Sequence, residues 1–189
     1  RRKDEGAVDA ALERLDFTHC DHPDRLPAEI ERLLAARQLT PEEAKLADRE
    51  GVAWFLSTPI AQRAADFARR RAAHEPGIHL RREIPFTWAA PLDPVAPPSD
   101  PADFPTIRGI IDLLLVDTRA RTAELIDYKT DSLHTWQSAL PNYQRQMRHY
   151  LRAASAILTF PVSTATLCFL TPHEIRAVPL EDAAASSTS

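Results

Sequence analysis

Two aspartates and a lysine lie in two apolar segments and are the residues best suited to chemistry. Asp112 lies within residues 109–116, and Asp127 and Lys129 lie within residues 124–131. An ionised carboxylate is almost never buried without a cation nearby, because its desolvation is costly. Oxygen ligands from two neighbouring acids suit Mg²⁺. The two segments therefore predict a divalent-cation site.

Strand geometry would bring these groups together. Side chains alternate along a strand, so Asp127 and Lys129 should face one side with Leu125, while Ile126 and Tyr128 face the other. In the first segment the same alternation gives two apolar faces, which is typical of a central strand. One face holds Ile110, Asp112, Leu114 and Val116, and the other holds Ile111, Leu113 and Leu115. A turn at residues 117–122 would make a hairpin that places Asp112 beside Asp127.

Helices and strands are expected to alternate along the rest of the chain. Thr-Pro pairs at Thr40 and Thr58 are typical helix starts, the first with capping-box spacing to Glu43. The crowded prolines of residues 90–105 predict a loop. The remaining expected elements are helices at 4–16, 28–37, 44–56, 60–73 and 141–158, strands at 79–88, 164–170 and 174–180, and a loop at 130–140.

Length and composition predict one α/β domain. The 189 residues, 44% hydrophobic and 26% charged, are typical of a soluble globular protein. Three parts are expected: an N-terminal helical part (1–78), a core (79–180) and a flexible tail (181–189). The chain starts at Arg1 and its only methionine is Met147, so we expect a piece of a longer protein. It has no phosphate-binding loop of the Walker type, so any motor would lie outside it.

Several classes of protein are disfavoured. The two cysteines, Cys20 and Cys168, cannot form a four-cysteine iron–sulfur cluster. No apolar run is long enough to cross a bilayer and no secretory signal is present, so we expect a cytoplasmic protein that does not contact a membrane. The net charge of −4 argues against indiscriminate DNA binding by the whole surface, although local groups of arginines can still neutralise phosphates.

Four motifs in order resemble the RecB-type PD-(D/E)xK nucleases, most closely the C-terminal nuclease domain of AddA-type helicase-nuclease subunits. They are the G-I-I-D-L-L-L run at 109–115, the L-I-D-Y-K-T-D run at 125–131, R-E-I-P-F at 82–86 and the Y-x-x-Q-x-x-x-Y pattern at 143–150. The resemblance extends from about Asp9 to Leu180. It implies a restriction-endonuclease-like core, in which a mixed sheet is flanked by helices, with an N-terminal helical segment.

The resemblance also implies an activity: Mg²⁺-dependent hydrolysis of DNA, with Mn²⁺ as a substitute. Asp112, Asp127 and the main-chain carbonyl of Tyr128 would hold the metal, and Lys129 would orient the attacking water. The substrate would be single strands supplied by helicase domains of the same longer chain, in double-strand-break repair and recombination. A second nuclease subunit is a further expected partner.

The roles of other motif residues stay open. Glu83 would bind the metal through water or position Lys129, or it is a surface glutamate. Gln146 and Tyr150 are four residues apart on one helix face, where they would contact DNA or support the metal-binding strand, and core packing is an alternative for Tyr150. Arg82 and Arg145 are expected to bind DNA.

One position departs from the family pattern. The family usually has a metal-binding histidine in an N-terminal helix, and this chain has Asp9 in that register. Aspartate is an oxygen ligand that Mg²⁺ accepts, so Asp9 is a candidate fourth ligand. Two alternatives follow: an active nuclease, or a catalytically impaired nuclease fold that serves as a DNA-binding or subunit-docking module.

Overall fold

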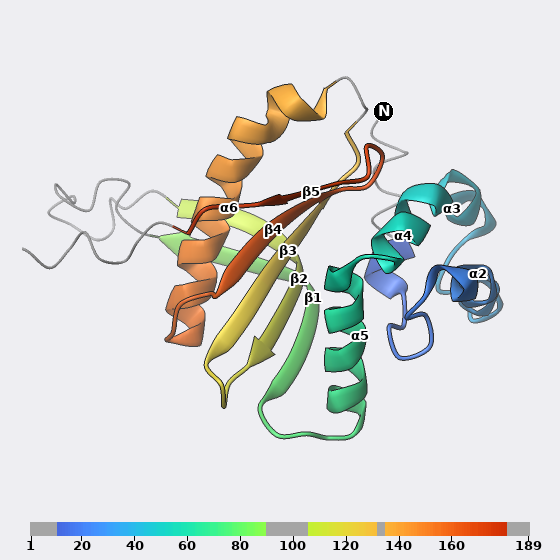
Figure 1. Ribbon diagram of the computed structural model, residues 1–189, viewed down its shortest axis with the longest axis horizontal. Coiled ribbons are helices and arrows are strands. Elements are labelled where there is room, and N and C mark those ends of the chain that lie inside the picture. Colours follow the sequence, from blue (N-terminus) through green and yellow to red (C-terminus); the bar gives the residue numbers. More distant parts are fainter. Residues whose placement is uncertain (1–10, 90–105, 132–134, 181–189) are drawn as a thin grey trace, which may run out of the picture.

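A five-stranded sheet with helices on both faces forms the centre of the molecule (Figure 1). The computed structural model describes residues 11–89, 106–131 and 135–180. The strands lie side by side in chain order. They are β1 (Ile78–Ala89), β2 (Thr106–Asp117), β3 (Thr122–Lys129), β4 (Thr164–Phe169) and β5 (Glu174–Ala177).

The sheet is mixed. β3 and β4 are parallel, whereas β1–β2, β2–β3 and β4–β5 are antiparallel. Parallel neighbours need a long crossover, and helix α6 (Trp136–Leu158) provides it. The β2–β3 hairpin turns where the sequence predicts it: the Asp117 carboxylate accepts hydrogen bonds from the backbone amides of Arg119 and Ala120, at 3.0 and 2.9 Å.

The N-terminal part is helical. Residues 11–14 are the described end of the first expected helix, and residues 4–10 lie outside the described part. The elements that follow are η1 (Pro23–Arg25), α2 (Leu26–Ala35), α3 (Pro41–Leu46), α4 (Arg49–Leu56) and α5 (Pro59–Ala72). Thr40 and Thr58 cap α3 and α5 as predicted, and Thr40 forms the reciprocal capping box with Glu43.

The single helix expected over residues 44–56 is wrong, because the chain forms two helices there. The break lies at Ala47 and Asp48, where Asp48 leaves helical geometry. Its carboxylate accepts a hydrogen bond from the Gly51 amide at 2.8 Å and caps α4. A side chain that bonds to the backbone competes with helix continuation in this way.

The predicted start of the long helix at Pro141 is also wrong. α6 begins at Trp136, and Pro141 lies inside it. Trp136 is 6% exposed and its ring lies 5.1 Å from that of Phe169. Burial of this large aromatic side chain offsets the missing proline hydrogen bond.

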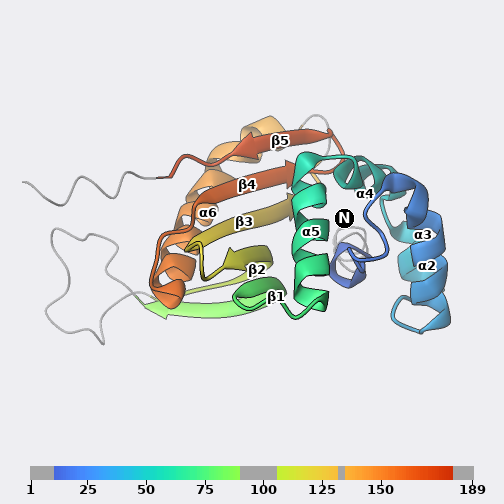
Figure 2. The same ribbon diagram turned by 60° about the horizontal axis from the view of Figure 1, so that its bottom comes forward.

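Two hydrophobic cores lie on opposite faces of the sheet. One joins Phe17, the N-terminal helices and α5 to the sheet, and the other joins α6 to it. Figure 2 shows α5 and α6 on opposite sides of the strands. This arrangement confirms the predicted fold class of a mixed sheet flanked by helices. No helix in the described ranges has the length and apolar character needed to cross a membrane.

Candidate active site

Strands β2 and β3 separate at the two aspartates predicted to form the site. Their pairing runs from Asp117 opposite Thr122 to Leu113 opposite Ile126 and stops there. One residue further along, the backbone amide of Tyr128 donates a hydrogen bond to Oδ2 of Asp112 at 2.7 Å. The Asp112 carboxylate thus replaces a backbone acceptor, which holds it between the strands near Asp127.

Asp127 and Lys129 form a buried ion pair. Nζ of Lys129 lies 2.7 Å from Oδ2 of Asp127, whose side chain is 2% exposed. The ammonium group also lies 4.6 Å from the centre of the Tyr143 ring, a cation–π contact. As predicted, Leu125 packs on the α6 side, while Ile126 and Tyr128 pack on the other side.

Electrostatics at the site favour an additional cation. Burial and the neighbouring Asp127 carboxylate raise the pKa of Asp112 to about 8. Burial also raises the pKa of Asp127, against the opposing effect of Lys129. Burial alone would lower the pKa of Lys129, but Asp127 and Asp112 raise it overall, so the lysine is protonated. One ammonium group therefore does not balance two acids, of which Asp127 is buried and Asp112 is partly buried.

Glu83 lies opposite Asp112 at an interruption in the β1–β2 ladder. The register pairs Arg82 with Leu113 and Ile84 with Ile111, and it omits the intervening pair. Glu83 has a φ of 48°, in the left-handed region that is uncommon for residues other than glycine. Its charge contributes to the raised pKa of Asp112, so Glu83 belongs to the electrostatic environment of the site.

Next to this interruption, one side chain of β2 lies on the face opposite to the predicted one. Alternation predicts Ile111 on the side of Leu113 and Leu115, but Ile111 packs in the α6-side core with Leu114 and Val116. Ile110 is 48% exposed. The irregular backbone at Glu83 and Asp112 shifts the alternation by one residue, which sequence periodicity cannot reveal.

Gln146 and Tyr150 of α6 lie over β2. Nε2 of Gln146 donates a hydrogen bond to the Tyr150 hydroxyl at 2.7 Å. The Tyr150 ring packs edge-on against Phe86 at 5.0 Å and is 6% exposed. A Cβ atom on Gly109 would lie 2.6 Å from the Tyr150 ring and 2.8 Å from the Phe86 ring. Gly109, three residues before Asp112, therefore leaves the space that the Tyr150 ring occupies.

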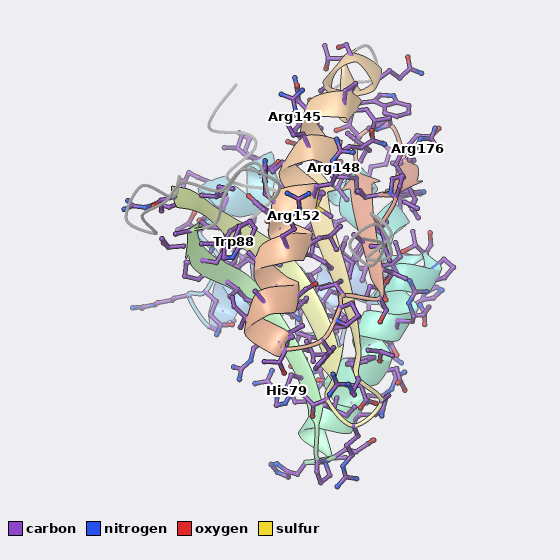
Figure 3. All side chains as sticks on the ribbon, turned by 90° about the vertical axis from the view of Figure 1, so that its left-hand side faces the viewer. His79, Trp88, Arg145, Arg148, Arg152 and Arg176 are labelled. Carbon is purple, nitrogen blue, oxygen red and sulfur yellow. The ribbon has the colours of Figure 1, made fainter. Side chains whose placement is uncertain are left out.

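The two arginines predicted to bind DNA differ in their surroundings. Arg82 stacks on Phe17 at 4.5 Å and donates a hydrogen bond to the carbonyl of Glu13, so it ties β1 to the N-terminal segment. Arg145 is exposed on α6. Figure 3 shows it with Arg148 and Arg152 along that helix. Asp9, the candidate fourth ligand, lies outside the described residues.

The donor set fits a divalent cation. Two carboxylates converge, and the buried Oδ2 of Asp127 has no aligned hydrogen bond within the described part, although it contacts the lysine. Carboxylate oxygens with spare acceptor capacity suit Mg²⁺, which keeps several waters of its own. No group of three or more His, Cys, Asp and Glu side chains is gathered for a metal within residues 11–89, 106–131 and 135–180. A cation here would therefore rely on two acids, a main-chain oxygen and water.

Sequence reasoning missed two contributors. Gly109 and Tyr143 lie in the sequence motifs, but the sequence alone does not assign them to the site. Tyr143 covers the Lys129 ammonium group and donates a hydrogen bond to Asp131 at 3.2 Å. The signal for both residues is their place in the motifs, Gly109 three residues before Asp112 and Tyr143 three residues before Gln146.

The fold and this arrangement define a class. The chain belongs to the PD-(D/E)XK nuclease superfamily, whose family profile matches residues 6–187. Members of this superfamily generally use divalent metals.

Its relatives include the A-type subunits of ATP-dependent helicase/nucleases. The protein from Oceanobacillus iheyensis is 29% identical over 185 residues, which is 93% of this chain and 14% of that protein. The protein from Pelotomaculum thermopropionicum is 28% identical over 175 residues, covering 90% of this chain and 13% of that protein. The protein from Bacillus licheniformis is 27% identical over 173 residues, covering 86% and 13%. The chain therefore corresponds to a small part of these relatives.

Proposed function

We propose that this chain is a Mg²⁺-dependent DNA nuclease. The observation that carries the proposal is the convergence of Asp112, Asp127 and Lys129 where β2 and β3 separate. The buried Asp127 and the partly buried Asp112, beside one ammonium group, leave negative charge that a divalent cation would balance. Membership of the nuclease superfamily supports the same function.

Asp112 and Asp127 would hold Mg²⁺, with the main-chain carbonyl of Tyr128 as a third protein ligand. The bound ion would supply charge stabilisation at the phosphate and an activated water. Asp112 already accepts the Tyr128 amide, so its carboxylate is oriented before a cation arrives. Such preorganisation lowers the cost of assembling the site.

Lys129 would orient the attacking water and offset negative charge in the transition state. Its pKa is raised by Asp127 and Asp112, against the effect of burial, so it stays protonated and is poorly suited to removing a proton. The Tyr143 ring restrains the ammonium group from the other side. Electrostatic stabilisation by a fixed charge is the role that this geometry supports.

Glu83 would position Lys129 or bind the metal through water. Gln146 would contact the DNA strand and, through its hydrogen bond, fix the Tyr150 hydroxyl. Arg145, exposed on α6, would contribute a phosphate contact, since arginine binds phosphate with paired donors. For Arg82 the stacking on Phe17 favours a structural role beside any contact with DNA.

We propose further that the chain acts as part of a helicase-nuclease. The relatives are named helicase/nuclease subunits and are much longer. Helicase domains of the same longer protein would then deliver single strands, in double-strand-break repair and recombination in the cytoplasm, together with a second nuclease subunit. Residues 1–78 and 79–180 would act as one nuclease domain, a view supported by the paired hydrogen bonds from Arg63 of α5 to Glu124 of β3.

The test is cleavage of labelled single-stranded DNA by the purified chain with Mg²⁺ or Mn²⁺. Asp127→Asn should reduce the rate by more than about a hundredfold, because even outer-shell partners of a metal are worth 10–100-fold. Asp24→Asn is the matched control, since the Asp24 side chain is 89% exposed. Equal rates for the two variants would refute the proposal.

Aspartate in place of the usual histidine favours a second candidate, a DNA-binding or docking module with impaired cleavage. The comparison is Asp9→His. A sharp rise in turnover would identify the native site as impaired and favour the module. Loss of turnover would identify Asp9 as a working ligand and favour the nuclease.

A further inference from the structure

A basic cavity lies at the start of β1 and includes Arg82 in its lining, but not Glu83. It has a volume of about 850 Å³ and is bounded by the N-terminal segment, α2, the end of α5 and the start of β1. Five arginines line the cavity. Asp16 is the one acidic residue among the described residues that line it. The arginines are Arg14, Arg32, Arg71, Arg81 and Arg82.

Two of these arginines are already paired with acids. Arg32 makes two hydrogen bonds to the buried Glu29 carboxylate, at 2.7 and 2.8 Å. Arg14 lies 3.3 Å from Glu43. The positive charge that remains in the cavity therefore comes from the other three arginines.

Those three arginines have no acidic partner within the described ranges. Arg71 and Arg81 are exposed and extend from two different elements, α5 and β1. The Arg82 guanidinium is fixed by Phe17 and the Glu13 carbonyl, and its buried Nε atom has no hydrogen-bond acceptor in the part of the chain described. A buried donor without an acceptor calls for a partner such as water or an ion, and the positive charge of this cavity favours an anion.

Among the described residues, Asp16 forms no ion pair with these three arginines. Its carboxylate accepts hydrogen bonds from the amide and hydroxyl of Thr18, at 2.9 and 2.6 Å, and it contacts His19 at 2.9 Å. These partners lower the pKa of Asp16 against the effect of burial. Its acceptor atoms are engaged by local partners, whereas Arg71 and Arg81 have no acidic partner among the described residues and Arg82 donates to a main-chain carbonyl rather than to an acid.

We propose that this cavity binds phosphate groups, and that the phosphates are those of a nucleic-acid strand. Guanidinium groups match phosphate oxygens in geometry and keep their charge. Arg82 directly precedes Glu83, so one edge strand carries both the cavity and a residue of the candidate active site. The assignment of the phosphates to a strand rests on the proposed nuclease function.

The experiment compares two double variants in buffer with EDTA, so that binding is measured without cleavage. Arg71→Gln with Arg81→Gln removes two charges from the cavity. Arg119→Gln with Arg121→Gln removes two charges from the exposed β2–β3 turn and is the matched control. The readouts are the affinity for a labelled oligothymidylate at several salt concentrations and the heat of pyrophosphate binding.

The cavity variant should bind the oligothymidylate about tenfold more weakly, with a salt slope shallower by about 1.4, which corresponds to two lost phosphate contacts on a single strand. The turn variant should stay within about twofold of the parent chain. Equal affinity of both variants for the oligonucleotide overturns the proposal for a strand, and if pyrophosphate binding alone is lost, the ligand is a free phosphate compound. Because no cleavage is measured, this result is independent of the Asp127→Asn test.

Discussion

The carboxylate of Asp112 accepts a hydrogen bond from the backbone amide of Tyr128 across the point where β2 and β3 stop pairing. This contact orients Asp112, one of the three proposed metal ligands. The amide that orients it belongs to β3, the strand that carries the other two ligands, Asp127 and the Tyr128 carbonyl. Because this side chain is already fixed, it loses little further conformational entropy when a cation binds.

Divalent cations should therefore stabilise the folded chain. At a Mg²⁺ concentration of 100 times the dissociation constant, the gain is about 2.7 kcal/mol for a single site. Thermal unfolding with EDTA and with Mg²⁺ measures it. Asp112→Asn and Asp127→Asn should abolish the increase, while Asp24→Asn keeps it. A shift that survives in Asp127→Asn would assign the metal to another part of the protein.

Gly109→Ala should disturb the contact between β2 and α6. The added methyl group would lie 2.6 Å from the Tyr150 ring and 2.8 Å from Phe86, both buried. Overpacking of this kind costs about 1–3 kcal/mol. Urea unfolding and the cleavage rate should both decline, whereas Ile110→Ala, at an exposed neighbour, should change stability little. Unchanged stability of Gly109→Ala would show that Tyr150 does not occupy this place.

Glu29→Ala should destabilise the N-terminal part. The buried Glu29 carboxylate accepts hydrogen bonds from the Asp16 amide at 2.8 Å and from Arg32. Truncation leaves these donors without an acceptor and should lower the free energy of unfolding by about 2–3 kcal/mol. Glu31→Ala, exposed on the same helix, is the control. Equal unfolding midpoints in urea would contradict the assigned contacts.

Acid should weaken the turn at Asp117. Hydrogen bonds from the amides of Ala120 and Arg119, together with Arg70, lower the pKa of Asp117 below its usual 3.8. A lowered carboxyl pKa contributes stability above the unfolded value, and that contribution is lost as the pH falls through the folded value. Asp117→Asn should thus be less stable than the parent chain at neutral pH, and the difference should shrink below about pH 4. A difference that is constant with pH would exclude this ionisation as its cause.

The sequence was sufficient to predict the placement of the two aspartates and the lysine, because this placement depends on local periodicity. Asp127, Lys129 and Leu125 share a face simply by strand alternation, and the hairpin turn brings Asp112 next to them. The helix caps at Thr40 and Thr58 are equally local.

Features that depend on distant contacts could not be predicted. Ile111 lies on the face opposite to the predicted one, next to the interruption of the β1–β2 ladder at which Glu83 has a positive φ, and no residue type in the sequence indicates this interruption. The start of α6 depends on Trp136 packing against Phe169, more than 30 residues away in the sequence. The stacking of the Arg82 guanidinium on Phe17, a residue of another segment, likewise has no signal in the local sequence pattern. In each case tertiary packing overrides the local pattern.

The most direct measurement is an anomalous-scattering map of crystals of the chain grown with Mn²⁺. We expect a peak within about 2.0–2.3 Å of carboxylate oxygens of both Asp112 and Asp127, with the Lys129 ammonium group beside it. A map in which Mn²⁺ binds elsewhere, with no peak between these two aspartates, would contradict it.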